Sequence, residues 1–370
     1  MRPDRIDQIV PSFAGRDAIG THVLHTRQAL RDAGYQSDVW AIDTLPEVRG
    51  EARPLAELTP ARRPGTWWLF HHSIGTPAAD IFAGRPEPKV LDYHNITPAG
   101  LLDRWAPWVR DEVELGRRQL VELARPCFFA LADSSYNEAE LTADGYPHTR
   151  VVPPLFDLAA FEETADPEVE ARLRADRRAG GADWLFVGRV APHKAQHDLI
   201  KALAVHRRLH DPEARLHLVG SGMGEDYPRA LQRFAQRIGV GDAVRITGMV
   251  SAGALAAYYR VADVFVCASE HEGFCVPVVE AMHLGLPVVA HAAAAVPETV
   301  GEGGLVLADR SPLALATAAQ RVVTDPGLRK VLVEAGRARA RYFSLERGRE
   351  RMVAAMEEAA RVAPDAPGTA

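Results

Sequence analysis

Residues 262–289 constrain the fold of this chain more than any other stretch. Ala262 to Ala268 is a short apolar run, rich in β-branched residues, with the length of a buried strand. A loop containing Gly273 follows, and Pro277 then stands where the first turn of a helix accepts proline. The stretch therefore predicts a strand, a loop and a helix that begins near Val276.

Two glutamates flank this predicted helix start. Glu272 lies in the loop, and Glu280 lies about one turn into the helix. The helix start offers unpaired N–H groups and the positive end of the helix dipole, which suit an anion or sugar oxygens. Each ionised carboxylate accepts hydroxyl donors, so the pattern is typical of a site that grips a sugar and a ribose. The alternative is an ordinary crossover whose glutamates are solvated, and periodicity alone leaves it open.

A βαβ pattern also opens the chain. Ile6 to Phe13 indicates a strand, Ile19 to Ala33 a helix that ends at Gly34, and Asp38 to Ile42 a second strand. Such a unit predicts a parallel sheet. Further strands are expected at Thr66 to Phe70, Lys89 to Tyr93 and Phe128 to Ala132. The first connecting loop lacks the Gly-x-Gly-x-x-Gly spacing, which disfavours a nicotinamide-binding domain.

The second half begins a new alternation with a predicted strand at Asp183 to Val187. Gly188, Arg189 and Lys194 follow it directly. Glycine permits close approach, Arg189 offers a fork of donors for phosphate oxygens, and Lys194 adds a compact charge. These residue types suit phosphate oxygens, and we call them the phosphate clamp; a surface salt bridge is the alternative for each cation. His193 and His197 lack a further ligand at a recognisable spacing, so we predict no metal site.

Later strands of the second half are expected at Arg215 to Val219, Val244 to Thr247 and Leu286 to Ala290, and a last helix at Leu345 to Arg361. The pattern divides the chain into an α/β domain at 1–157, a linker with a helical segment at 158–182 and a second α/β domain at 183–343. The last segment, 363–370, is rich in Pro, Gly and Ala, and we expect it to be a disordered tail.

These motifs together resemble a known enzyme family. The Glu-Gly-Phe-x-x-Pro-x-x-Glu-Ala-Met pattern from Glu272 to Met282 and the Gly-Arg-x-x-x-x-Lys pattern from Gly188 to Lys194 are similar to those of the retaining GT-B glycosyltransferases of the sucrose-synthase and mannosyltransferase type. The resemblance implies two Rossmann-like domains with parallel sheets that face each other across a cleft. It also implies that the helix at 344–362 crosses back to the first domain.

The implied reaction moves a hexose-type sugar from a UDP- or GDP-linked donor to a hydroxyl acceptor, with retention at the anomeric carbon. No cofactor is implied beyond the donor substrate. The acceptor could be a sugar, a cyclitol, a lipid-linked glycan or another small molecule. A phosphorylase on the same scaffold, which would use free phosphate, is the second interpretation. A non-catalytic sugar-nucleotide sensor or a NAD-dependent enzyme is the third, and the intact clamp and glutamates argue against both.

The resemblance also gives roles to single residues. His94, at the carboxyl end of a predicted strand, matches the histidine that the family presents to the donor sugar. Arg189 and Lys194 would neutralise the leaving diphosphate, while Glu272 would hold sugar hydroxyls and Glu280 the ribose. The remaining donor contacts are expected at Asp17, Ala18, Gly188, Gly222, Met249, Val250, Phe274, Cys275 and Val276.

This sequence departs from the family pattern at two places, one of them a pair of residues. Many relatives carry a Gly-Gly pair at the start of the first helix, where backbone N–H groups meet the diphosphate, and here Asp17 and Ala18 take its place. Cys275 occupies a position that usually holds a glycine whose N–H meets the sugar. Since both substitutions keep a backbone N–H, the contacts would run through the main chain.

Composition excludes several other classes. A net charge of −6 disfavours a nucleic-acid surface, which needs clustered basic residues. The three cysteines stand apart in apolar contexts, so we expect no disulfide framework and a cytoplasmic protein. No run is long and apolar enough to span a membrane. A helix is expected at Trp105 to Arg125, but acidic residues interrupt its arginines, so membrane contact would be peripheral at most.

Overall fold

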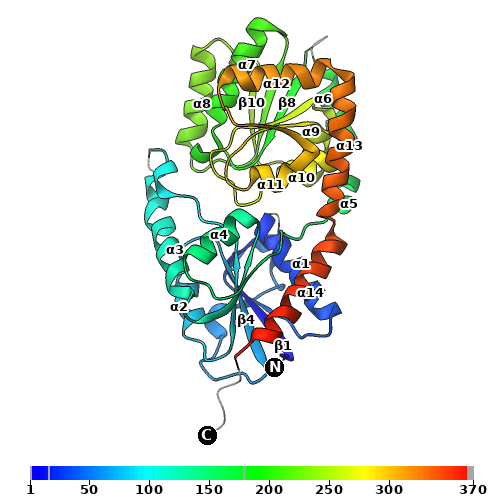
Figure 1. Cartoon of the computed structure of the whole chain (residues 1–370). Helices are drawn as coiled ribbons and strands as arrows, with labels where there is room; N and C mark the ends of the chain where they lie inside the picture. The colour runs from blue at the N-terminus through cyan, green and yellow to red at the C-terminus, as the bar shows by residue number, and fades with distance from the viewer. Residues whose placement is uncertain (1, 16, 103, 178–180, 365–370) are drawn as a thin grey trace. The chain divides into compact units, whose positions relative to one another are not determined.

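The computed structural model describes residues 2–15, 17–102, 104–177 and 181–364. The chain forms two compact units (Figure 1). The first unit contains Met1–Ala99, Trp108–Phe156 and Phe343–Ala370, and the second contains Gly100–Pro107 and Asp157–Tyr342. The second unit is therefore an insertion within the first along the sequence.

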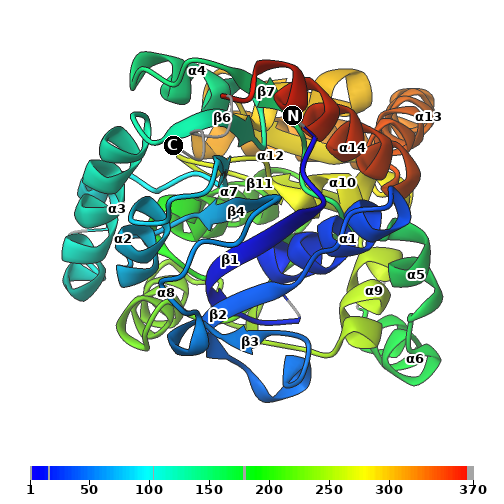
Figure 2. The same cartoon turned by 90° about the horizontal axis from the view of Figure 1, so that it is seen from below.

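The first unit is built on a parallel sheet of seven strands in the order β3-β2-β1-β4-β5-β6-β7 (Figure 2). Its strands are β1 (Arg5–Phe13), β2 (Val39–Thr44), β3 (Arg53–Pro54), β4 (Thr66–His72), β5 (Lys89–Tyr93), β6 (Cys127–Ala132) and β7 (Thr149–Val151). Its α-helices are α1 (Ala18–Asp32), α2 (Pro77–Ala83), α3 (Arg110–Leu123), α4 (Ser135–Ala143) and α14 (Leu345–Val362). In this unit, α14 packs beside α1, and α2 packs beside α3.

The second unit is built on a parallel sheet of six strands in the order β10-β9-β8-β11-β12-β13. Its strands are β8 (Asp183–Val187), β9 (Arg215–Val219), β10 (Val244–Gly248), β11 (Val264–Cys267), β12 (Val288–His291) and β13 (Gly304–Leu307). Its α-helices are α5 (Leu158–Glu163), α6 (Pro167–Ala175), α7 (Gln196–Leu209), α8 (Asp226–Arg237), α9 (Ala252–Val261), α10 (Val276–His283), α11 (Val296–Val300), α12 (Pro312–Thr324) and α13 (Pro326–Tyr342). Two parallel-sheet α/β domains were predicted, and this fold class is confirmed.

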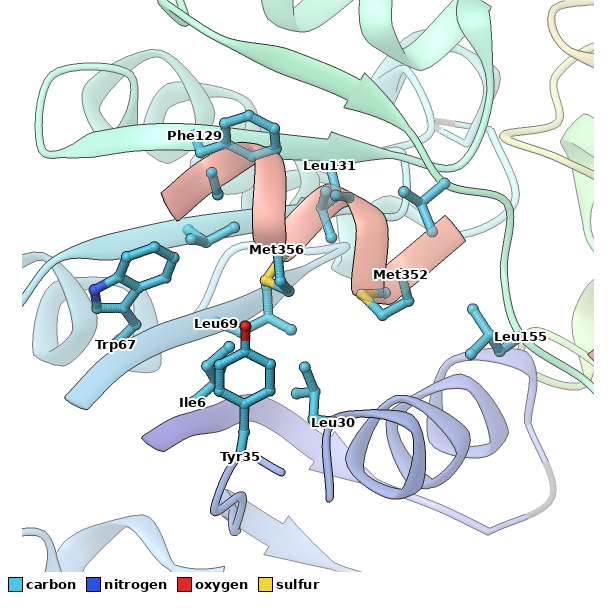
Figure 3. Close-up of a cluster of buried hydrophobic side chains, with 14 residues drawn as sticks. Ile6, Leu30, Tyr35, Trp67, Leu69, Phe129, Leu131, Leu155, Met352 and Met356 are labelled. Carbon is cyan, nitrogen blue, oxygen red and sulfur yellow. The ribbon is translucent and has the colours of Figure 1, made fainter. Parts of the chain in front are cut away.

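The last helix completes the core of the first unit. Met352 and Met356 of α14 are fully buried, and Figure 3 shows them among side chains from the sheet and from α1. The cluster also contains Ile6, Leu30, Tyr35, Trp67, Leu69, Val90, Phe129, Leu131, Val152, Leu155, Ala355 and Ala359. Apolar burial of this size is the main favourable term in folding, so the first unit depends on a helix encoded after the second.

Several segments lie differently from their predicted places. The helix expected from Trp105 begins only at Arg110, and a 3-10 turn precedes it at Pro107–Val109. Pro107 explains the delay, because the residue before a proline is disfavoured in the α conformation. The 100–107 segment, assigned by sequence to the first domain, packs with the second unit.

The expected linker at 158–182 contributes to the second unit. It contains α5 and α6, and α6 packs against α9 of that unit. Residues 178–180 lie outside the described part of the chain, as do residues 365–370 of the expected tail. Ala363, also assigned to that tail, packs against the core cluster of the first unit. Within the described residues, no helix has both the length and the hydropathy required to cross a membrane.

Candidate functional site

The candidate residues of the second unit gather at one edge of its sheet. Parallel strands carry their loops at a common carboxyl end, which is where open α/β sheets bind ligands. Each candidate except Glu280 lies in a loop after β8, β9, β10 or β11 or at the start of α10, and Glu280 lies in the first turns of α10. These residues are Gly188, Arg189, Lys194, Gly222, Met249, Val250, Glu272, Phe274, Cys275, Val276 and Glu280.

Arg189 follows β8 in a tightly packed loop. Gly188 has a φ of +147°, and a Cβ at Gly220 would lie 2.1 Å from the Gly188 carbonyl oxygen. The side chain of Gln196 donates a hydrogen bond of 2.9 Å to the Arg189 carbonyl oxygen and so fixes its backbone. The Arg189 side chain is exposed and has no hydrogen-bond or ion-pair partner among the described residues. The loop therefore presents an unengaged guanidinium beside the strand end.

Lys194 and Glu272, to which the sequence analysis gave separate roles, form one ion pair. The Nζ of Lys194 lies 2.6 Å from Oε2 of Glu272, and the side chains are 16% and 10% exposed. Burial lowers the pKa of Lys194, but the Glu272 carboxylate outweighs this effect and the pKa is raised. Ser269 donates a hydrogen bond of 2.8 Å to Oε1 of Glu272. Both charges are thus held in place before any substrate arrives.

The loop before α10 is held by several backbone contacts. Thr299 donates through Oγ1 to the Phe274 carbonyl oxygen at 2.6 Å, and the N–H of Ala295 donates to the Glu272 carbonyl oxygen at 3.2 Å. Cys275 caps the helix with φ of +78°, a left-handed conformation that few residues other than glycine adopt. The helix begins at Val276 as predicted. The strained cap persists because its surroundings fix it.

The carboxylate of Glu280 accepts a hydrogen bond of 2.7 Å at Oε2 from the hydroxyl of Tyr259. Burial raises the pKa of Glu280 to about 7, although the Tyr259 hydrogen bond lowers it. Its charge therefore changes within the physiological pH range, a property often found at functional sites.

The loop after β9 is paired to the Arg189 loop. Val190 accepts a hydrogen bond from the N–H of Met223 at 2.9 Å, and its own N–H donates to Ser221. Gly222 lines a shallow pocket of about 560 Å³ with Gly224, Glu225, Pro228, Arg229 and Gln232. After β10, Met249 is 72% exposed and Val250 is half-buried. The pocket therefore lies between the loop after β9 and the first turns of α8.

In the first unit, the candidate His94 belongs to a buried polar cluster. Donor atoms of four residues from α1, β4, β5 and the loop after β5 lie within 4.8 Å of one another. These residues are His22, His71, Asp92 and His94. Such a set could hold either a metal ion or a proton, and the hydrogen bonds around it decide between the two.

His71 is a neutral acceptor toward His94. The side-chain amide of Gln8 donates to the Val23 carbonyl oxygen at 3.3 Å, so its oxygen accepts from Nε2 of His71 at 2.8 Å. The proton of His71 is therefore on Nε2, and Nδ1 carries a lone pair. Burial lowers the pKa of His71 well below its usual range, which keeps the ring neutral.

His94 donates from both ring nitrogens. Its Nε2 lies 3.0 Å from Nδ1 of His71, and its Nδ1 lies 3.0 Å from Oδ1 of Asp133. Two acceptors require two protons, so His94 is an imidazolium. Burial lowers the pKa of His94, but the carboxylates of Asp133 and Asp92 prevail and raise it to about 9.

The ring geometry places a proton, not a metal ion, between the two histidines. The rings of His71 and His94 are nearly coplanar, at 4°, with centroids 5.3 Å apart. That separation exceeds the 3.0 Å between the nitrogens by about two centroid-to-nitrogen radii. Both nitrogens therefore lie near the line joining the ring centres, as a linear hydrogen bond requires. A metal bound to both at about 2.1 Å would lie about 1.5 Å from that line, away from the direction of either lone pair.

The tautomer of His22, another member of the cluster, is fixed in the same way. The N–H of Leu155 donates to Nδ1 of His22 at 2.9 Å, so the proton of His22 is on Nε2 and points at Asp92, 2.8 Å away. His94 is thus a charged side chain with both N–H groups engaged within its own unit. It lacks a free lone pair, so it is not a general base in this arrangement.

The donor contacts expected at Asp17 and Ala18 would lie at the start of α1, which an acidic side chain caps. Asp17 is the N-cap, and its Oδ1 accepts from the N–H of Gly20 at 2.6 Å. A Cβ at Gly20 would lie 1.6 Å from the Ala14 carbonyl oxygen, so this turn needs glycine there. The Asp17 carboxylate places a negative charge at the helix start, where a diphosphate would need N–H groups. Arg16 of this loop lies outside the described residues.

Sequence reasoning missed the residues that hold the candidates in place. Ser269 and Tyr259 bind the two glutamates, and His22, Gln8 and Asp133 fix the His94 cluster. Ser134 caps α4, whereas Asp133 beside it binds His94. The one available signal was its place directly after a buried strand.

The chain is similar to several known proteins. Residues 173–339 match the family model described as glycosyl transferases group 1. A D-inositol 3-phosphate glycosyltransferase of Kribbella flavida is 30% identical over 313 residues, which cover 80% of this chain and 72% of that protein. One from Geodermatophilus obscurus is 36% identical over 243 residues, covering 62% of this chain and 52% of that protein. The chain spans about half the length of this relative and of two further relatives that have the same name.

Solved structures share the fold at low identity. A complex of Anabaena HepE with UDP and glucose has a TM-score of 0.74 at 18% identity and covers 95% of this chain and 99% of its own. The sucrose-phosphate synthase of Thermosynechococcus elongatus has a TM-score of 0.71 at 20% identity, with 96% and 99% covered. WaaG, a glycosyltransferase involved in lipopolysaccharide biosynthesis, has a TM-score of 0.70 at 14% identity, with 95% and 98% covered. These likenesses support the expected GT-B architecture.

Proposed function

Because the chain belongs to the glycosyl transferases group 1 family, we propose that it transfers a hexose-type sugar from a nucleoside-diphospho-sugar to a hydroxyl acceptor with retention at the anomeric carbon. The observation that carries this proposal is the convergence of Arg189, Lys194, Glu272 and Glu280 at one edge of the second sheet. Two cations suit a diphosphate, and two carboxylates suit the hydroxyls of a sugar and a ribose.

The two cations act on the leaving group. As the bond from the anomeric carbon to the phosphate oxygen breaks, negative charge grows on the diphosphate. Arg189 binds phosphate oxygens through its exposed guanidinium. Lys194 has three N–H donors, so its ammonium keeps its bond to Glu272 and donates a further one to phosphate. Because the ion pair is already in place, this stabilisation requires little reorganisation.

Retention follows from a front-face displacement. Among the described residues, Glu272 and Glu280 are the carboxylates of this cluster, and Lys194 and Tyr259 already engage them. Neither is arranged as a nucleophile below a sugar. The departing phosphate oxygen therefore accepts the proton of the acceptor hydroxyl, and the acceptor oxygen bonds to the same face of an oxocarbenium-like carbon.

We predict that the new linkage has the same anomeric configuration, axial or equatorial, as the donor sugar. Proton NMR of the first-formed product measures the coupling constant at the anomeric carbon of the new linkage. An inverted linkage would contradict the proposed reaction. A trapped adduct of the sugar on Glu272 would instead leave retention standing and replace the front-face mechanism by a double displacement.

Donor and acceptor are identified by a screen. Relatives named D-inositol 3-phosphate glycosyltransferase support a cyclitol phosphate as the first acceptor to test, beside free sugars. A comparison of the thermal stabilisation by UDP with that by GDP identifies the nucleotide of the donor. Stabilisation by free phosphate with no response to either nucleotide would favour a phosphorylase.

Nucleotide affinity should fall as the pH is lowered through 7. The pKa of Glu280 is about 7, and only the ionised carboxylate accepts two ribose hydroxyls, so the contact is present above pH 7 and lost below it. From pH 8 to pH 6 we expect about a tenfold weaker Kd for the nucleoside diphosphate, measured by calorimetry.

Two variants isolate that contact. Glu280→Gln should bind weakly at all pH values and keep only the shallow dependence that comes from the nucleotide's own terminal phosphate. Glu272→Gln should keep the pH dependence of the wild type and lose transfer instead. If the two variants exchange these behaviours, the roles of the two glutamates are reversed.

A further inference from the structure

Two thiols and a carboxylate converge in the loop between β11 and α10. Sγ of Cys267, Sγ of Cys275 and a carboxylate oxygen of Glu272 lie within 4.8 Å of one another, and we call these three residues the thiol cluster. Cys267 is the last residue of β11, and Cys275 is the N-cap of α10. All three residues are buried, at 1%, 8% and 9% exposed.

The contacts within the thiol cluster are polar. The Sγ atoms of Cys267 and Cys275 lie within 4.8 Å of each other, and Sγ of Cys267 donates to Oγ of Ser269 at 3.3 Å. Ser269 in turn donates to Glu272. The left-handed backbone at Cys275 is unfavourable for a residue with a Cβ, yet it is the conformation in which this thiol meets its partner.

We propose that the thiol cluster binds a thiophilic divalent cation such as Zn²⁺, and that the bound cation inhibits the enzyme. Cysteine thiolates and a glutamate carboxylate are ligand types that zinc accepts, and three protein ligands leave a fourth position for water. Zn–S bonds of about 2.3 Å and Zn–O bonds of about 2.1 Å in a tetrahedron separate the ligand atoms by about 3.4–3.8 Å. Since its ligand atoms lie within 4.8 Å of one another, the cluster must contract by about 1.4 Å at most.

The charges of the site balance. Both thiols lose their protons to solvent as the cation binds, so two protons are released for each cation taken up. Two thiolates, one carboxylate and a divalent cation sum to a charge of −1. The ammonium of Lys194, 2.6 Å from Glu272, compensates that charge. No like charge is left uncompensated beside the metal.

Inhibition follows from the residues that the cation engages, and this part rests on the proposed function. A metal-bound Glu272 has a coordinated oxygen that no longer accepts a sugar hydroxyl. Lys194, held by the negative metal site, has less attraction for a diphosphate. The cation and the donor thus compete for one loop, so each weakens the affinity for the other by the same factor.

The test is a titration of the full chain with Cd²⁺, followed by the ultraviolet absorption of thiolate-to-metal charge transfer. We expect one cation per chain. Removal of an outer partner of a metal ligand already costs about 10- to 100-fold in affinity, so Cys267→Ser and Cys275→Ser should each lose at least about that much. Cys127→Ser is the matched control, since Cys127 is a buried thiol of β6 in the first unit. Circular dichroism confirms that each variant is folded.

The outcomes separate the site from its consequence. Absence of the charge-transfer band in the wild type, or its persistence in the Cys267→Ser/Cys275→Ser double variant, overturns the site. The competition is measured as the Kd of the nucleoside diphosphate with and without Zn²⁺. Cation binding with an unchanged nucleotide Kd overturns the inhibition and keeps the site. Failure of the nucleotide to bind at all counts against the proposed function, because the Cd²⁺ titration requires no nucleotide.

Discussion

Replacement of Lys194 by Ala is expected to lower turnover on the order of 10²-fold or more. The substitution removes a cation that stabilises the departing diphosphate, and it also leaves the buried Glu272 carboxylate without its ion-pair partner. Arg189→Ala should lower turnover by the same order. In this variant the loss comes only from weaker stabilisation of the leaving diphosphate. The rates are measured with saturating donor and acceptor. The chain has no Asp-x-Asp motif to hold a catalytic cation, so a chelator should not lower turnover.

Lys201 provides a matched control for this prediction. Lys201 lies on α7, and its side chain is 43% exposed. Its ammonium forms an ion pair of 2.8 Å with Asp198. Lys201→Ala removes the same type of charge seven residues further along the chain. We expect little change in rate, because exposed ion pairs contribute little free energy. Equal losses in Lys194→Ala and Lys201→Ala, or a loss on chelation that Mg²⁺ or Mn²⁺ restores, would show that the leaving group is stabilised in another way.

Met356→Ala should destabilise the first unit by about 2–5 kcal/mol. Met356 is 0% exposed and packs in the core that α14 shares with the sheet (Figure 3), so its truncation leaves a cavity between elements far apart in the sequence. Urea unfolding followed by tryptophan fluorescence measures the change. Since the chain has two units, the transition that belongs to the first unit must be resolved before a free energy is assigned.

Met249→Ala is the control for the core substitution. Met249 is 72% exposed, so the same change of side chain there should alter the free energy of unfolding by no more than about 0.5 kcal/mol. A comparable loss at both positions would mean that the effect comes from the residue type and not from the packing of α14.

The sequence predicted those parts of the fold whose signals are local. β5, β8 and β9 begin and end as predicted because each is a short apolar run with turn residues after it. The start of α10 at Val276 followed from Pro277. The start of α3 did not, because the helical pattern from Trp105 obscured the effect of Pro107. The 158–182 segment also lacked a signal that α6 packs against α9.

The candidate site was predicted residue by residue but not as a set of contacts. The bond between Lys194 and Glu272 joins positions 78 apart in the sequence, and nothing local to either indicates the other. The charge of His94 depends on Asp133, 39 residues away, and on the tautomer of His71. Motif spacing predicts which residues could carry chemistry. The protonation states come from partners that only the folded sheets bring together.

The placement of α14 has a consequence for synthesis on the ribosome. The first unit lacks Met352 and Met356 until the whole of the second unit has been translated, because α14 follows it in the chain. The nascent first sheet must therefore wait with part of its apolar surface exposed, while the second unit already has all of its strands. Vectorial folding thus favours the later unit, and the final helix determines when the earlier one becomes stable.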